Sequence, residues 1–141
     1  MCPDTYDQWE WIPFGGSCYK LVNNSATFSQ AQSYCEDVEN NAELLSIHSH
    51  EENNFIGKLI QDNRISYVLL GGRVTSQADI CNEDEVKWFW TDGSPWNFTR
   101  WYPDYPTCSS YYYCTELRNS DFGVRWYNIH CTESNPFVCK F

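Results

Sequence analysis

The sequence predicts an α+β domain in which two helices come before mixed, mostly antiparallel β-structure and a long irregular loop region. Two segments with helix-capping signals lie in the first half of the chain, and after about residue 65 the pattern changes to short strands separated by turns. Eight cysteines in 141 residues are too many for a reducing compartment, so we expect disulfides. This length fits a single domain, residues 1–141.

The first half of the chain is expected to form a hairpin and two helices. Residues 2–22 alternate aromatic and polar side chains around Gly15 and Gly16, which indicates a hairpin with residues 17–22 as the return strand. Each helix opens with a capping-box pair and carries an apolar face. The capping pairs are Thr27 with Gln30 and Ser49 with Glu52; the apolar faces are Phe28, Ala31 and Cys35, then Phe55, Ile56, Leu59 and Ile60. Residues 44–47 form a short apolar connector between the helices.

The second half is expected to be β-structure interrupted by two irregular segments. The strand candidates are residues 67–70, ended by Gly71 and Gly72; residues 86–90, ended by the turn Thr91-Asp92-Gly93; and residues 112–117, 124–126 and 136–140. Residues 73–85 and 94–111 have little regular pattern. Because long irregular loops in a small domain usually carry function, a binding site is expected there.

Charge and sorting signals limit the partners and the location. The formal net charge of −10 disfavours nucleic acid and anionic membranes as ligands. No apolar run of about 18 residues is present, so we expect no direct membrane insertion of this domain. Sequons at Asn23 and Asn97 are typical of a secretory route, and Met1 directly before Cys2 is consistent with a removed secretion signal. A secreted or cell-surface glycoprotein is therefore expected.

The histidines and cysteines do not form a recognisable catalytic or zinc site. His48 and His50 are two residues apart, whereas a helical zinc pair needs a spacing of four, and the adjacent Ser49 and Glu52 are explained by a helix cap. The chain contains no C-x-x-C motif and no G-x-S-x-G motif. We therefore expect no enzymatic activity.

Six groups of residues recur in an order and spacing that together are specific. They are Cys2-Pro3 with Cys18-Tyr19; Phe28, Ala31 and Cys35; residues 42–49 followed by Glu52 and Phe55; residues 69–72; residues 90–95 followed by Trp101; and Cys114, Cys131 and Cys139. Over nearly the whole chain this pattern resembles the C-type lectin-like domains, in their long form with an N-terminal hairpin disulfide. The resemblance implies an extracellular recognition module with that fold.

The same resemblance implies the disulfide connectivity. The family framework gives Cys35–Cys139 and Cys114–Cys131, with Cys2–Cys18 on the hairpin. This leaves Cys81 and Cys108 as an extra pair outside the common framework, which would tie residues 73–85 to the long loop. A stiffened loop loses less conformational entropy when it binds a ligand.

The resemblance also identifies the positions where sugar-binding members hold calcium. Those members use a Glu-Pro-Asn or Gln-Pro-Asp triplet, a later Glu, and an Asn-Asp pair after a tryptophan. The matching positions here are Tyr105-Pro106-Thr107, Tyr112 and Tyr127-Asn128. Calcium needs several oxygen ligands with negative charge among them, and this set offers only Asn128. An alternative register, Tyr102-Pro103-Asp104, adds one acid, Asp104.

A second calcium position of some relatives is expected to be replaced by a lysine. The matching residues in the connector and the second helix are Ser46, His48 and Glu52, but Lys140 follows Cys139 where those relatives have an acid. The lysine ammonium can pair with Glu52 in place of the ion. No cofactor is therefore predicted at either position, with calcium at Asp104 and Asn128 as the alternative.

The long-loop face is rich in tyrosine and serine, a mixture typical of binding surfaces. Half of this signal is explained if the rings pack on a small core of the loop itself. The candidate ligand-binding residues are Trp101, Tyr102, Asp104, Tyr105, Tyr111, Tyr112, Tyr127 and Asn128, with Tyr102, Tyr105, Tyr111 and Tyr127 expected to form an exposed patch. The predicted function is recognition of a protein or glycan ligand through this face without the standard calcium site, as a monomer or homodimer. The alternative is a calcium-dependent lectin with a variant site.

Overall fold

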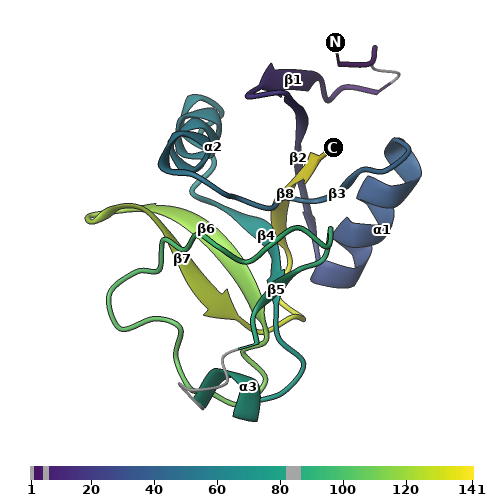
Figure 1. Cartoon of the computed structure of the whole chain (residues 1–141). Coiled ribbons are helices and arrows are strands. Elements are labelled where there is room, and N and C mark those ends of the chain that lie inside the picture. The colour runs from purple at the N-terminus through teal and green to yellow at the C-terminus, as the bar shows by residue number, and fades with distance from the viewer. Residues whose placement is uncertain (1, 5–6, 82–86) are drawn as a thin grey trace.

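The computed structural model describes residues 2–4, 7–81 and 87–141, and in these it contains three helices and eight strands. Figure 1 shows both chain ends at the same end of the molecule and the irregular loops at the opposite end. The elements in chain order are β1 (Trp11–Phe14), β2 (Ser17–Ala26), α1 (Phe28–Val38), β3 (Glu43–Leu44), α2 (His50–Asp62), β4 (Tyr67–Arg73), α3 (Ala78–Cys81), β5 (Phe89–Trp90), β6 (Cys114–Ser120), β7 (Gly123–Ile129) and β8 (Asn135–Lys140). None of the described helices is long and apolar enough to cross a membrane. The order of elements confirms the predicted α+β class.

The strands form one sheet in the order β1-β2-β8-β4-β6-β7, with β3 paired to β8 and β5 paired to β4. The C-terminal strand β8 lies antiparallel to β2 and parallel to β4, so it joins the hairpin end of the sheet to the loop end. The other described strand pairs are antiparallel. The predicted mixed, mostly antiparallel arrangement is therefore confirmed.

The two longer helices cover opposite faces of the sheet. Successive residues of a strand point to opposite faces, and in β4 Val68 and Leu70 pack with α2, whereas Leu69 packs with α1. Figure 1 shows α1 and α2 on either side of β2 and β8. Each helix therefore buries its apolar stripe in a separate hydrophobic cluster.

The helix starts follow the capping signals, with one difference. Thr27 and Gln30 form a complete capping box, since the side chain of each accepts a hydrogen bond from the backbone of the other. In α2 the hydroxyl of Ser49 accepts the amide of Glu52 at 3.1 Å, but the Glu52 carboxylate does not return to Ser49. It accepts the amide of His48 at 2.8 Å and takes part in a buried polar network. Glu52 thus serves the site described below rather than the cap alone.

The prediction that β4 ends at Gly71 and Gly72 was wrong. The strand continues to Arg73, and Thr91 donates its amide to the Gly71 carbonyl at 3.0 Å. A Cβ on Gly71 would lie 2.9 Å from the carbonyl oxygen of Leu44. These glycines therefore allow neighbouring backbone to approach the strand closely and do not end it.

The remaining differences concern element ends. The return strand β2 runs to Ala26, β6 begins at Cys114 instead of residue 112, and β6 and β7 are longer than expected. Of the strand expected at residues 86–90, the described part is β5, and Val86 lies outside the described residues. The short helix α3 lies within the segment expected to be irregular, which also extends into undescribed residues.

All four expected disulfides are present: Cys2–Cys18, Cys35–Cys139, Cys81–Cys108 and Cys114–Cys131. The second joins α1 to β8 across 104 residues of sequence. The third connects the end of α3 to the long loop. No free cysteine is found among the described residues. The framework therefore fixes both ends of the long-loop region.

Candidate functional site

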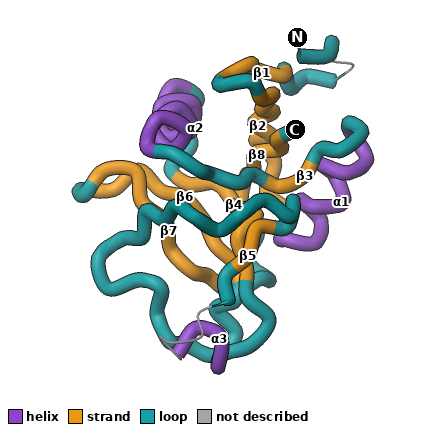
Figure 2. The backbone as a smooth tube through the Cα atoms, in the orientation of Figure 1, coloured by secondary structure: helices purple, strands orange, loops and turns teal. Residues whose placement is uncertain are grey.

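The site is built on the long segment between β5 and β6, residues 91–113, which Figure 2 shows as an extended loop that passes beside β7. The loop is attached to β7 by backbone hydrogen bonds. The Trp126 amide donates to the Arg100 carbonyl at 2.8 Å, and the Tyr102 amide donates to the Trp126 carbonyl at 2.9 Å. The loop is thus held against the sheet through Trp126.

A cluster of tryptophans lies beneath the loop. Trp126 is fully buried, and rings of the loop and of β5 pack against it. Its ring contacts have centroid distances of 5.4–5.9 Å: Trp90, Trp96, Phe98 and Trp101. The Trp126 indole also donates a hydrogen bond to Asn53 of α2 at 2.8 Å. Trp101, a predicted ligand-binding residue, therefore packs inward as half-buried support for the loop.

Above this cluster lie four rings that we name the aromatic face: Tyr102, Tyr105, Phe122 and Tyr127. Tyr102 stacks on Tyr127 with the ring centroids 4.9 Å apart, and Tyr105 meets Tyr127 edge-on at 4.9 Å. Phe122, in the turn between β6 and β7, packs edge-on against Tyr102 at 5.3 Å and is 54% exposed. The Arg118 guanidinium lies 4.5 Å from the Tyr127 ring centroid. The loop and the β6–β7 hairpin thus present one aromatic surface.

The predicted patch of four exposed tyrosines was wrong in two respects. Tyr127 is only 8% exposed, because Tyr102, Tyr105 and Arg118 cover it, and burial raises the pKa of its hydroxyl. Tyr111 is 69% exposed but lies apart, since its ring contact among the described residues is with Tyr113 at 5.9 Å. Tyr112 instead meets the His130 ring at 4.4 Å.

Phe122 and Arg118 were missed by the sequence analysis. A weak signal was available: Phe122 stands in the turn Asp121-Phe122-Gly123, where a large apolar residue is seldom buried. Its contact with Tyr102 depends on the path of a loop 20 residues away in sequence, which no local pattern predicts.

Asn128 has an internal role that uses both ends of its amide. Its side-chain oxygen accepts the Thr107 amide at 2.8 Å and the Thr107 hydroxyl at 3.2 Å. Its nitrogen donates to the carbonyls of Thr107 at 2.8 Å and Tyr112 at 3.1 Å. The side chain is 1% exposed. Asn128 therefore fixes the loop to β7.

These contacts leave little for a calcium ion at this position. Both lone pairs of the Asn128 side-chain oxygen already accept hydrogen bonds, so an ion would have to break them. Asp104 is exposed, in a left-handed turn at φ 69°, and the Tyr105–Pro106 peptide bond that follows is cis. Among the described residues no group of three or more histidine, cysteine or acidic side chains could hold a metal ion. The residues present do not fit the ligand set that calcium needs.

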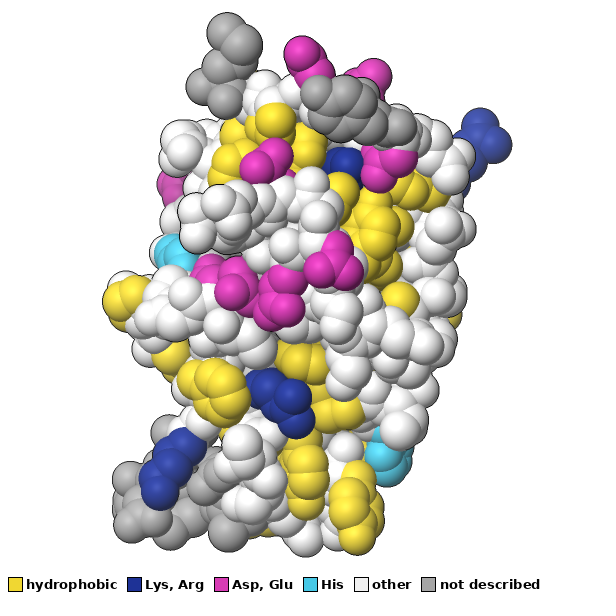
Figure 3. All heavy atoms as spheres, turned by 90° about the vertical axis from the view of Figure 1, so that its right-hand side faces the viewer, with side chains coloured by type: hydrophobic (Ala, Val, Ile, Leu, Met, Phe, Trp, Pro, Cys, Tyr) yellow, Lys and Arg dark blue, Asp and Glu magenta, His cyan; other side chains and the backbone are white. Residues whose placement is uncertain are grey.

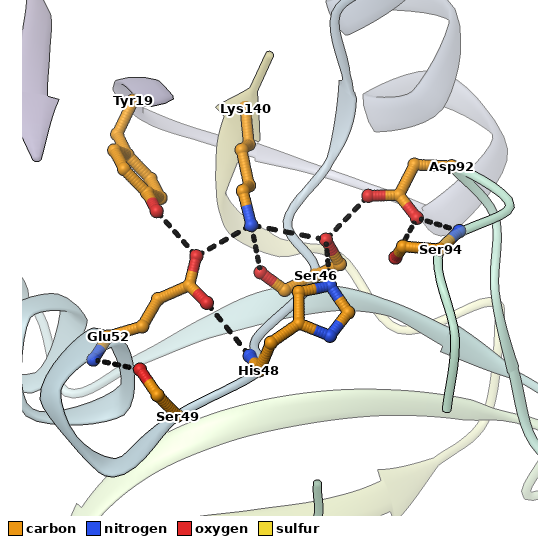
Figure 4. Close-up of polar contacts among 8 residues, drawn as sticks. All are labelled: Tyr19, Ser46, His48, Ser49, Glu52, Asp92, Ser94 and Lys140. Atoms are coloured by element: carbon orange, nitrogen blue, oxygen red, sulfur yellow. Dashed lines mark hydrogen bonds and ion pairs between the residues drawn. The ribbon is translucent and has the colours of Figure 1, made fainter. Parts of the chain in front are cut away.

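The second position expected to replace calcium holds a buried ammonium, shown in Figure 4. Lys140 lies 2.6 Å from a carboxylate oxygen of Glu52 and also donates to the Ser46 carbonyl at 3.1 Å. The Tyr19 hydroxyl donates to the same Glu52 oxygen, and the side chains of Lys140 and Glu52 are only 13% and 9% exposed. The predicted Lys140–Glu52 pair is therefore confirmed.

The network continues from Lys140 to the turn that opens the long loop. The Ser46 hydroxyl donates to Asp92, which also accepts the amide of Ser94 at 2.9 Å and its hydroxyl. Burial alone would raise the pKa of Asp92, but these hydrogen bonds and the charge of Lys140 lower it below its ordinary value of 3.8. The connector, the last strand and the loop are thus joined by one polar chain.

The lowered pKa of Asp92 predicts a loss of stability in acid. A carboxyl whose pKa is lower in the folded state stabilises the fold above its unfolded pKa of 3.8, and this contribution is lost as the pH falls through the folded value. In urea unfolding at a series of pH values, the free energy of unfolding should fall less steeply for Asp92→Asn than for the wild type below about pH 4. Equal slopes for the two proteins would contradict the assignment.

Comparisons with known proteins agree with this architecture. Residues 24–141 match the family model described as Lectin C-type domain. Snaclec 3 from Sistrurus catenatus edwardsii is 33% identical over 133 residues, and one chain of the Snaclec coagulation factor IX/factor X-binding protein from Gloydius halys is 31% identical over 134; each alignment covers 92% of this chain and 81% of the relative. A solved structure, a Ca²⁺-dependent type II antifreeze protein in its Ca²⁺-free form, superposes with a TM-score of 0.77 at 26% identity, covering 93% of this chain and 96% of that one.

Proposed function

The chain belongs to the C-type lectin domain family, and from this premise we propose that it is an extracellular recognition module that binds a protein ligand through the aromatic face without calcium. In this proposal the domain binds and does not catalyse, and it needs no cofactor. It is secreted or displayed on a cell surface, in keeping with its disulfide framework.

The observation that carries the proposal is the use made of the family's sugar-site positions. Where sugar-binding members keep oxygen ligands, this chain has Tyr105 and Tyr127 in the ring cluster and Asn128 fully engaged with Thr107 and Tyr112. Aromatic side chains supply a large contact area at low cost in conformational entropy. The position thus favours contact by rings over coordination by an ion.

A protein ligand is favoured over a glycan for two reasons. Phe122, the most exposed ring of the aromatic face, has no polar group with which to bind sugar hydroxyls, whereas aromatic anchors are typical of protein interfaces. Two relatives from Gloydius halys and one from Protobothrops flavoviridis are named for binding coagulation factors, which are proteins. These names support a protein ligand here as a class and do not identify it.

The proposal is tested by screening the domain against arrayed extracellular proteins and arrayed glycans, each with millimolar calcium and with EDTA. We expect binding to one or more proteins with equal affinity in both buffers. Binding that disappears in EDTA would contradict the proposal and support the calcium-dependent alternative at Asp104. Binding to glycans alone would contradict the choice of a protein ligand.

Variants of the aromatic face locate the interaction on the surface. Phe122→Ala and Tyr102→Ala should each weaken binding of the selected protein by about tenfold or more, because truncating a central aromatic anchor costs over about 1 kcal/mol. Phe141→Ala is the matched control, since this ring is 37% exposed and packs against Trp11, outside the aromatic face. Equal affinity of all three variants would show that the ligand binds elsewhere.

A further inference from the structure

A groove of about 440 Å³ lies at the end of β4 and shares no residue with the aromatic face. Its walls come from three segments that are far apart in sequence: the end of β4, the residues just before β6, and the residues just after β7. The lining residues are Arg73, Tyr111, Tyr113, His130, Cys131 and Thr132. We name it the Arg73 groove.

Arg73 carries a cation that lacks an acidic partner within the described part of the chain. Its guanidinium lies over the Phe28 ring, 4.9 Å from the centroid, and no described carboxylate lies within ion-pair distance of it. Its Nε atom is buried and makes no hydrogen bond to the described residues. Because a buried N–H group without an acceptor is costly, this atom is an unused donor in the groove wall.

The rest of the groove is apolar and aromatic. Tyr111 is 69% exposed at a left-handed backbone position with φ 66°, while Tyr113 packs on the small core formed by Val74, Ile80 and Trp88. The rings of Tyr111 and Tyr113 lie 5.9 Å apart. A ligand with an apolar group next to a charge could thus contact rings and guanidinium together.

The groove also differs in charge from the protein as a whole. The net charge is −10, yet the described lining includes an arginine and a histidine and no acidic side chain. On the α1 side of the molecule, Figure 3 shows acidic side chains in the upper part only; below them, Lys or Arg side chains lie beside hydrophobic ones. An anionic group on a ligand would therefore meet favourable charge here.

We propose that the Arg73 groove binds a carboxylate-bearing segment of a protein partner, in which the carboxylate pairs with the Arg73 guanidinium and an adjoining apolar group packs on Tyr111 and Tyr113. An arginine fork matches a carboxylate with two parallel hydrogen bonds, which gives the contact both strength and orientation. The proposal rests on the proposed function only in taking the ligand to be a protein.

Hydrocinnamate is a suitable probe, since it joins a phenyl group to a carboxylate, and its neutral amide, hydrocinnamamide, is the matched control ligand. Both are titrated into the isotope-labelled domain while the signals of Arg73, Tyr111, Tyr113 and His130 are followed by NMR. We expect hydrocinnamate to bind with a Kd in the range of about 1–10 mM, as befits a fragment of this size. The amide should bind about tenfold more weakly, because it lacks the charge.

Three variants test the assigned contacts. Arg73→Met keeps an apolar side chain over Phe28 and should abolish the preference for the acid over the amide. Tyr111→Ala removes an exposed ring and should weaken both probes by about threefold to tenfold without affecting the fold. Lys58→Met is the control for net charge, since Lys58 is exposed and pairs only with Asp62 among the described residues; it should leave both affinities within about twofold.

Equal binding of acid and amide to the wild type would overturn the proposal, as would an unchanged acid preference in Arg73→Met. Absence of any shift at the groove signals up to about 20 mM probe, beyond the range expected for a fragment, would also overturn it. None of these outcomes bears on the aromatic face, whose test uses different residues and a different ligand. The two proposals can therefore fail separately.

Discussion

Replacing Lys140 with methionine is expected to lower the free energy of unfolding by about 3–5 kcal/mol, because it leaves the buried Glu52 carboxylate without its cation. The Lys140 ammonium lies 2.6 Å from Glu52, and the Glu52 side chain is only 9% exposed. Methionine keeps most of the length of the lysine side chain, so lost packing contributes little. Urea unfolding at neutral pH, followed by tryptophan fluorescence, measures the change.

Two controls separate the buried charge from other effects. The double variant Glu52→Gln with Lys140→Met removes both charges and should recover about half or more of the loss, since the uncompensated carboxylate is gone. Lys58→Met breaks an exposed pair with Asp62 and should cost no more than about 1 kcal/mol. A loss in Lys140→Met as small as that in Lys58→Met would mean that the ammonium is not needed at this position.

Trp126→Ala is expected to have the other large effect, a loss of about 3–5 kcal/mol or enough to prevent folding. Trp126 is fully buried and four aromatic rings pack around it, so its removal leaves a large cavity. The loop that carries the aromatic face rests on this residue, so binding of the ligand should be lost together with stability. Thermal and urea unfolding give the first quantity, and binding in the calcium-free buffer gives the second.

Trp126→Phe distinguishes the hydrogen bond from the packing. It retains a buried ring but removes the indole donor, which leaves the Asn53 side-chain oxygen without that partner. We expect an intermediate loss of about 1–3 kcal/mol. If Trp126→Ala were no less stable than Trp126→Phe, the ring cluster would not be the support of the loop.

Much of the fold could be predicted because its signals are local. The capping pairs placed both helix starts, and the hairpin turn at Gly15 and Gly16 placed the first two strands. The disulfide pairing followed from the family resemblance and not from local pattern. Glycines 71 and 72 were misjudged, because the same residue that ends strands also permits close backbone approach, and only the three-dimensional neighbours decide between the two.

The candidate site was predictable in composition but not in arrangement. Sequence alone identified the tyrosines and the pairing of Lys140 with Glu52, which depends on one charge reversal beside a cysteine. It could not assign Tyr127 to the buried layer or place Phe122 beside Tyr102, because these contacts join a hairpin turn to an irregular loop. Burial of a loop residue is a tertiary property, and the tyrosine side chain is compatible with both environments.

The central claim is that the long-loop face is organised by its own side chains and needs no calcium to bind its ligand. A calcium titration of the isotope-labelled domain followed by NMR tests it most directly, through the amide signals of Asp104, Thr107 and Asn128. The account predicts no saturable shift at these residues up to about 10 mM calcium, well above the weakest Kd of extracellular calcium modules. Shifts at Asp104 and Asn128 that saturate with a Kd below about 1 mM would contradict it and establish a variant calcium site.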